Sequence, residues 1–264
     1  MTVVASRRGT AALAGAFLFA AAFPLKAQVV DSIPPLPPTD SLTDSLAVAD
    51  SLAGRLLDSM AMAGDTVQLP YAGPLPPTAA NALAYILASA PDTPGGMGLL
   101  DAARAEAQIA LQHAAFAGRD STNLGNMQRH MAHVIHAVDP GQGSQGPGMG
   151  YGVRRAARQI EAQIENAQRV EGIPGALVFH APRVAMAARG TAARVDEVVA
   201  LARQIQSAGS AQAGNRLVRR LADAVRAMAY GFDRDGDRRI GHTEDEMGLA
   251  QIGHHLTLVE RLTR

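Results

Sequence analysis

The chain has 264 residues and equal numbers of basic and acidic side chains, so its formal net charge is zero. A neutral balance argues against a nucleic-acid partner, for which a basic domain is expected. The chain has no cysteine. That absence excludes disulfides, thiolate metal sites and a lipid anchor on an N-terminal cysteine.

The N-terminus has the pattern of an export signal. Arg7 and Arg8 precede a wholly apolar run over residues 11–23, and Ala27 is a small residue suited to cleavage. This pattern predicts a signal peptide over residues 1–27. The apolar run is shorter than a bilayer requires. We therefore expect an exported protein, in the periplasm or outside the cell, with a membrane contact only if the signal segment is retained.

Residues 28–77 are rich in proline, aspartate and serine, which predicts a linker between the signal peptide and a folded domain. The triplet Asp-Ser-Leu repeats at Asp40, Asp44 and Asp50. Apolar residues in this region recur at steps of four and three: Leu42, Leu46, Ala49, Ala53, Leu56 and Met60. Two interpretations stay open. The segment 40–62 is either a helix that docks on a protein partner in the cell envelope or a disordered acidic spacer.

From residue 78 to residue 264 every periodic segment predicts a helix, so the expected fold class is an all-α bundle. Alanine is abundant and aromatic residues are scarce, which predicts a core of closely packed helices. Pro182 suits the first turn of the longest helix. That helix carries an apolar seam typical of bundles, made of Val184, Ala188, Thr191, Val195, Val198, Ala202 and Ile205. The other expected helices cover residues 79–89, 99–117, 121–138, 153–170, 211–232 and 243–262.

Eight histidines in a protein without cysteine favour a transition-metal hypothesis, because imidazole is the remaining strong ligand. His130, His133 and His136 form a stripe on the polar face of the helix 121–138, where neighbours three residues apart can share an ion. His113 falls on an apolar face of the preceding helix. The alternative is a solvated polar face and a core histidine. His180 is expected to reach the same region, and His254 and His255 to lie at the surface.

The segment 111–136 resembles the repeating His-Ala helices of small exported metal-binding bundle proteins. The resemblance covers about two helices. It implies that His113, His130, His133 and His136 are ligands of a transition metal or of haem.

A second metal motif lies between the last two helices. Acidic residues occupy loop positions 1, 3 and 5 (Asp233, Asp235 and Asp237), and Glu244 occupies position 12. This loop resembles the calcium-binding loop of the EF-hand family. The resemblance implies a calcium site that includes the carbonyl of Arg239 and a helix-loop-helix unit over residues 211–262. Position 6 requires a positive φ, and Arg238 occupies it. The entering helix is expected to bury Val225, Met228, Ala229 and Phe232.

No motif for catalysis accompanies these candidates. The sequence has no Gly-x-Ser-x-Gly elbow and no His-Glu-x-x-His helix, and the glycine-rich stretch 141–152 lacks the ending of a phosphate loop. We therefore expect a non-enzymatic protein in which calcium orders the C-terminal helix-loop-helix. One alternative is a periplasmic bundle that binds a transition metal or haem through the histidines. The other is an envelope scaffold without metal.

Overall fold

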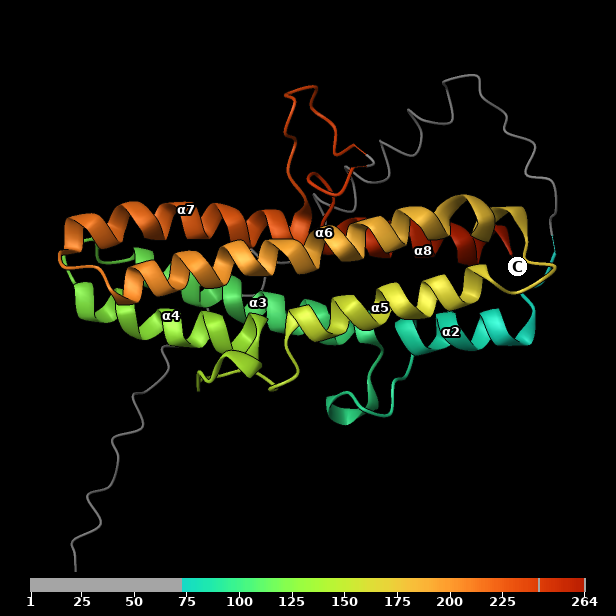
Figure 1. The fold of residues 1–264 in the computed structure, drawn as a ribbon, viewed down its shortest axis with the longest axis horizontal. Coiled ribbons are helices and arrows are strands. Elements are labelled where there is room, and N and C mark those ends of the chain that lie inside the picture. Colours follow the sequence, from blue (N-terminus) through green and yellow to red (C-terminus); the bar gives the residue numbers. More distant parts are fainter. Residues whose placement is uncertain (1–72, 242, 264) are drawn as a thin grey trace, which may run out of the picture. The chain divides into compact units, whose positions relative to one another are not determined.

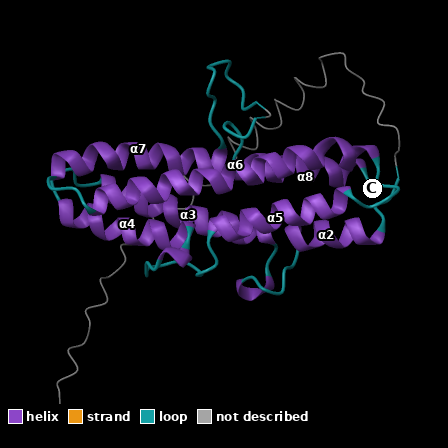
Figure 2. Ribbon diagram, in the orientation of Figure 1, coloured by secondary structure: helices purple, strands orange, loops and turns teal. Residues whose placement is uncertain are grey.

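The computed structural model describes residues 73–241 and 243–263, and within them all regular structure is helical (Figure 2). The seven α-helices of these residues are α2 (Pro77–Leu87), α3 (Leu99–Gly118), α4 (Leu124–Val138), α5 (Val153–Gln168), α6 (Gly175–Gln206), α7 (Ala211–Tyr230) and α8 (Leu249–Leu262). Two short 3₁₀ helices, η1 (Pro94–Gly96) and η2 (Pro140–Gln142), interrupt the connections. The predicted all-α class is confirmed. The predicted signal peptide and nearly all of the linker lie outside the described residues.

The long helix α6 organises the bundle. Its 32 residues span about 48 Å at 1.5 Å per residue. It packs against α4, α5, α7 and α8, while α3 packs against α4, α5 and α7. In Figure 1, α7 and α8 follow one another along α6, and α4 and α5 do the same on the other side. Of the helices that the structure describes, none is both long and apolar enough to cross a membrane.

The core is built largely from alanine and branched aliphatic side chains. Every residue of the predicted α6 seam is buried, from Val184 to Ile205. On α3, Ala102 is buried, whereas Ala105, Ile109 and Phe116 are half-buried. The residues that α3 buries instead include Ala103, Ala107, Ala110, Ala114 and Ala117. Small alanine side chains let α3 approach several neighbours closely, so its core face lies along the alanines.

The start of α6 differs from the prediction. Pro182 lies inside the helix, which begins seven residues earlier at Gly175, after Pro174. A proline within a helix removes one backbone donor and usually ends the helix. Here the additional turns bury Leu177 and Ala181, and this packing offsets the missing hydrogen bond.

The last helix also begins later than predicted, at Leu249 rather than near Thr243. Gly248 fixes this start, because a Cβ there would lie 2.7 Å from the carbonyl oxygens of Ala227 and Met228. Its N–H donates to Oε1 of Gln251 at 2.8 Å. The expected burial is confirmed for Val225, Met228 and Ala229 but is wrong for Phe232, which is 55% exposed because α7 ends at Tyr230.

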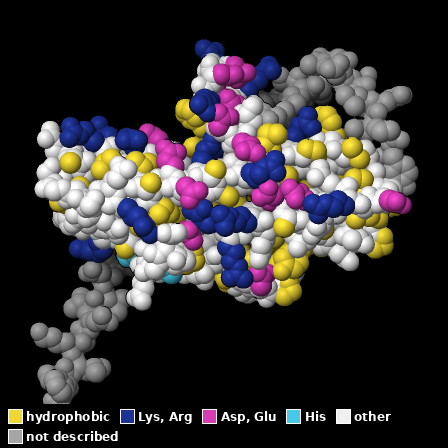
Figure 3. Space-filling model, viewed as in Figure 1, with side chains coloured by type: hydrophobic (Ala, Val, Ile, Leu, Met, Phe, Trp, Pro, Cys, Tyr) yellow, Lys and Arg dark blue, Asp and Glu magenta, His cyan; other side chains and the backbone are white. Residues whose placement is uncertain are grey.

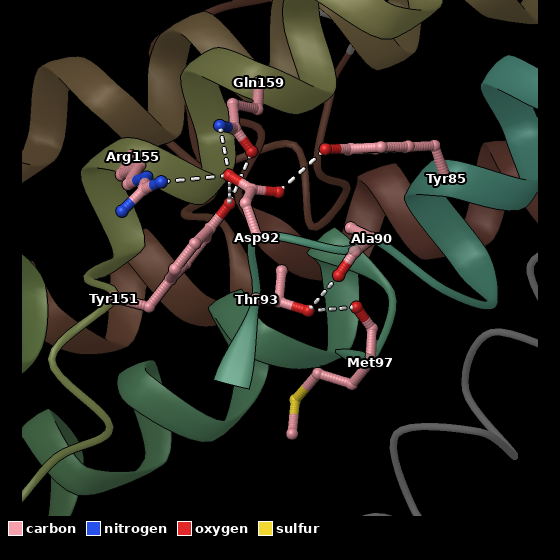
Figure 4. A network of polar contacts seen from close by, with 8 residues as sticks. All are labelled: Tyr85, Ala90, Asp92, Thr93, Met97, Tyr151, Arg155 and Gln159. Carbon is pink, nitrogen blue, oxygen red and sulfur yellow. Dashed lines mark hydrogen bonds and ion pairs between the residues drawn. The ribbon is translucent and has the colours of Figure 1, made fainter. Parts of the chain in front are cut away.

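A polar network joins the loop after α2 to the beginning of α5 (Figure 4). Oδ1 of Asp92 accepts a hydrogen bond from Tyr85 at 2.7 Å, and Oδ2 accepts from Tyr151 at 3.0 Å. Oδ2 also accepts from Arg155 and Gln159, each at 2.9 Å. The hydrogen bonds from Gln159, Tyr85 and Tyr151, in this order of effect, hold the pKa of Asp92 well below its usual range. The network therefore fixes Tyr151 at the end of the glycine-rich stretch.

Candidate metal centres

Helices α3 and α4 bring three histidines together. A short turn joins the two helices, and the side chain of Asn123 caps α4 by accepting from the N–H of Asn126 at 2.9 Å. His113 on α3 and His130 and His133 on α4 lie at similar distances from this turn. Nδ1 of His113 is 2.9 Å from Nδ1 of His130 and 3.3 Å from Nδ1 of His133. Ring nitrogens of all three lie within 4.8 Å of one another. We call these residues the three-histidine group.

The surroundings of this group favour neutral imidazoles. All three residues are partly buried, and the ring of Phe116 packs edge-on against His113 with 5.5 Å between ring centroids. Burial and then the neighbouring imidazoles lower the pKa of His113 to about 4. Burial also lowers the pKa of His130 and His133. The three imidazoles are therefore neutral at neutral pH, which is the state in which imidazole binds a metal.

The spacing of the three nitrogens fits one transition-metal ion. Histidine nitrogens lie about 2.0–2.1 Å from a tetrahedral zinc ion, so two of them are roughly 3.3–3.4 Å apart. The two separations from Nδ1 of His113, 2.9 and 3.3 Å, differ from this by about half an ångström at most, and the ring nitrogens of His130 and His133 lie within 4.8 Å of each other. The rings thus need only small side-chain movements to bind an ion. Figure 3 shows small patches of histidine side chains on this face of the molecule. Each residue of the three-histidine group is only partly buried, so the group keeps some access to solvent.

The other histidines lie apart from this group. Nδ1 of His136 donates to the carbonyl oxygen of Ser144 at 2.8 Å. The prediction that His180 reaches the same region is wrong: its Nδ1 lies 3.2 Å from Nδ1 of His255 on α8, and both residues are buried. Because α6 begins early, His180 is a helical residue that faces α8. The surface position predicted for His255 is also wrong, and His254 is half-buried.

The acidic loop between α7 and α8 gathers three carboxylates. Oxygens of Asp233, Asp235 and Asp237 lie within 4.8 Å of one another, with Asp235 and Asp237 exposed. Asp233 accepts hydrogen bonds from the N–H groups of Gly236 at 2.7 Å and Arg238 at 2.8 Å. Arg238 adopts φ +68°, the conformation that the sixth position of the motif requires. The loop therefore has the predicted turn even without glycine at this position.

Glu244 lies outside the three-carboxylate group. Its Oε1 accepts from Nε of Arg189 on α6 at 2.7 Å, and its side chain is exposed. The buried carboxylate of the loop is Glu246, which accepts from the N–H groups of Arg234 at 3.2 Å and Gly241. The sequence motif did not indicate Glu246, because it lies two residues beyond position 12. The N–H of Arg239 donates to Asp237 at 2.8 Å, and the role of its carbonyl stays a prediction.

A further residue that sequence reasoning missed is Glu106. It is fully buried on α3, and its Oε1 accepts from the N–H groups of Tyr151 at 2.9 Å and Gly152 at 3.2 Å. Glu106 lies on the same helical face as Ala103 and Ala110. An acidic residue is unusual on such an apolar face, and this position was the sequence signal that could have identified it. Glu106 therefore anchors the beginning of α5, where negative charge is favourable.

Comparison with known proteins gives no relative: no family model, no curated protein and no solved structure matches the chain. The resemblances to EF-hand loops and His-Ala helices therefore stay predictions from their motifs. Function has to be argued from the two metal-ligand groups themselves.

Proposed function

We propose that this protein is a non-enzymatic metal-binding protein and that its three-histidine group holds one transition-metal ion such as Zn²⁺, Cu²⁺ or Ni²⁺. The observation that carries the proposal is the convergence of three imidazole nitrogens from two helices. His113 supplies one nitrogen, 2.9 and 3.3 Å from those of His130 and His133. Imidazole suits these ions, whereas calcium and magnesium require oxygen ligands.

The geometry favours an ion over haem. Three nitrogens this close together leave no room for a macrocycle between them, whereas a haem iron takes its axial ligands from opposite sides of the ring. Three protein ligands leave a fourth position of a tetrahedral ion open to water or to a donor from a partner. An open fourth position suits a protein that binds an ion and transfers it to a partner. Such a role requires no catalytic group. An exported location, as the N-terminal pattern predicts, agrees with this role.

Calcium binding by the acidic loop is a second candidate function. Its support is the approach of the carboxylates of Asp233, Asp235 and Asp237 within 4.8 Å, together with the positive φ of Arg238. Glu244 would have to leave Arg189 to become a ligand, because its carboxylate now pairs with that guanidinium. This competition predicts weaker binding than in a loop whose twelfth residue is free. Calcium would then reduce repulsion among the aspartates and order the connection between α7 and α8.

The two candidates are separated by titration of the full chain with Co²⁺, whose visible absorption bands report its ligands. We expect one Co²⁺ per chain with bands typical of nitrogen ligation. The bands should disappear in the double variant His113→Ala/His133→Ala and remain in Asp233→Ala/Asp235→Ala. Excess Ca²⁺ should leave the bands unchanged. An unchanged spectrum in the histidine double variant would exclude the three-histidine group as the site.

A further inference from the structure

The glycine-rich segment, residues 143–150, connects η2 to α5 and is held weakly. Among the described residues, the part from Ser144 to Gly150 makes one hydrogen bond, in which the carbonyl of Ser144 accepts from Nδ1 of His136 at 2.8 Å. Segments with few hydrogen bonds and exposed backbone open at low free-energy cost. This segment can therefore separate from α4 without unfolding the bundle.

The same segment lies directly against a proposed metal ligand. A Cβ on Gly146 would lie 2.7 Å from Cδ2 of His133 and 3.0 Å from its Cα. Real Cβ atoms do not approach so closely. The backbone of Gly146 therefore touches the imidazole of His133, and only glycine permits this contact without a shift. The segment covers the Cδ2 side of that ring, whereas Nδ1 on the other side lies 3.3 Å from Nδ1 of His113.

Two hydrogen-bonding residues hold the segment in this position, together with Met149, whose side chain packs against the core. His136 bonds to Ser144 near its beginning. Glu106 binds the two N–H groups that follow its end, those of Tyr151 and Gly152, through Oε1. Oε2 of Glu106 has no hydrogen-bond partner among the described residues, and a Cβ on Gly148 would lie 2.9 Å from it. The backbone at Gly148 is thus packed onto the buried carboxylate.

From these contacts we infer that the glycine-rich segment is a cover over the ring of His133 within the three-histidine group, and that Glu106 and His136 are positioning residues that set the rate of metal exchange. The inference rests on the proposed function, because it assigns a role relative to the ligand His133. Release of an ion requires its bond to His133 to break, and the His133 ring turns away freely only when the segment has lifted. Loosening the segment should therefore speed entry and release together and leave affinity nearly unchanged.

The test uses the full chain loaded with Co²⁺ and measures its release to excess EDTA by stopped-flow absorbance. Gly146→Ala pushes the segment from His133, and His136→Ala removes the hydrogen bond to Ser144. His136→Ala should release Co²⁺ about five- to tenfold faster, the factor expected for one lost hydrogen bond, and Gly146→Ala should also release it faster than wild type. The Co²⁺ spectrum should not change, and Kd should change less than threefold. The matched control is Gly141→Ala, because a Cβ there meets only Oδ1 of Asp139 at 3.4 Å.

Glu106 provides a second, independent comparison. Glu106→Ala should also speed release, whereas Glu106→Gln keeps an oxygen acceptor for the N–H groups of Tyr151 and Gly152 and should restore the slow rate. Release at the wild-type rate in both Gly146→Ala and His136→Ala would overturn the cover. Loss of the Co²⁺ spectrum in His136→Ala would overturn it too, by making His136 a ligand. A wild-type chain that binds no Co²⁺ would refute the proposed function and the cover together.

Discussion

Replacing His113 by alanine is the most informative single change. Nδ1 of His113 is the nitrogen that lies within 3.3 Å of both other members of the group. Its removal leaves two ligands on α4 and none on α3. Changes in residues that only support metal ligands typically weaken binding 10- to 100-fold, so loss of a ligand should cost at least about 100-fold in Kd. That factor corresponds to about 2.8 kcal/mol.

The assay is competition for Zn²⁺ against a fluorescent chelator at pH 7.5, with wild type and His113→Ala compared at equal concentration. The control is His254→Ala, which removes a half-buried histidine of α8 that lies outside the three-histidine group. It should bind like wild type. Thermal unfolding of both variants checks that the bundle is intact. A Kd for His113→Ala within threefold of wild type would refute the reasoning, because the nitrogen common to both short contacts would then be dispensable.

Three further predictions concern pH, calcium and the polar network. Because the pKa of His113 falls from 6.5 to about 4 on folding, the unfolded chain binds more protons between these values. Stability should therefore fall as pH drops through this window, and His113→Ala should flatten that slope in urea unfolding curves. Calcium should raise the melting temperature of wild type but not of Asp233→Ala/Asp235→Ala, and equal shifts would exclude the loop as the site. Asp92→Ala removes the acceptor of four side chains and should cost about 1–3 kcal/mol of unfolding free energy. An unchanged urea midpoint would show that the network does not stabilise the fold.

Helical periodicity predicted most of the fold because the bundle buries continuous apolar stripes. The α6 seam from Val184 to Ile205 is buried throughout, as its steps of four and three residues indicated. The boundaries that failed depend on tertiary contacts. Packing around Leu177 extends α6 to the N-terminal side of Pro182. The close approach of Gly248 to Ala227 and Met228 places the start of α8 later in the chain. Local propensity contains no information about such contacts.

The candidate sites were predictable to the extent that their residues share a helix or a tight loop. The three aspartates of the acidic loop follow from spacing alone, and so does the pair His130 and His133. His113 approaches that pair because α3 packs against α4, and the spacing of residues does not predict this packing. Periodicity could not show that His136 turns to Ser144 instead. Glu106 was missed because its partners, two backbone N–H groups, lie more than forty residues away in the chain.

The most direct test of the central claim is a native mass spectrum of the full chain, purified without chelators or an affinity histidine tag. The three-histidine proposal predicts one Zn²⁺, Cu²⁺ or Ni²⁺ per wild-type chain and none in the variant His113→Ala/His130→Ala/His133→Ala. A wild-type chain that stays bare after incubation with these ions would contradict it. An equal metal load in the triple variant would contradict it as well.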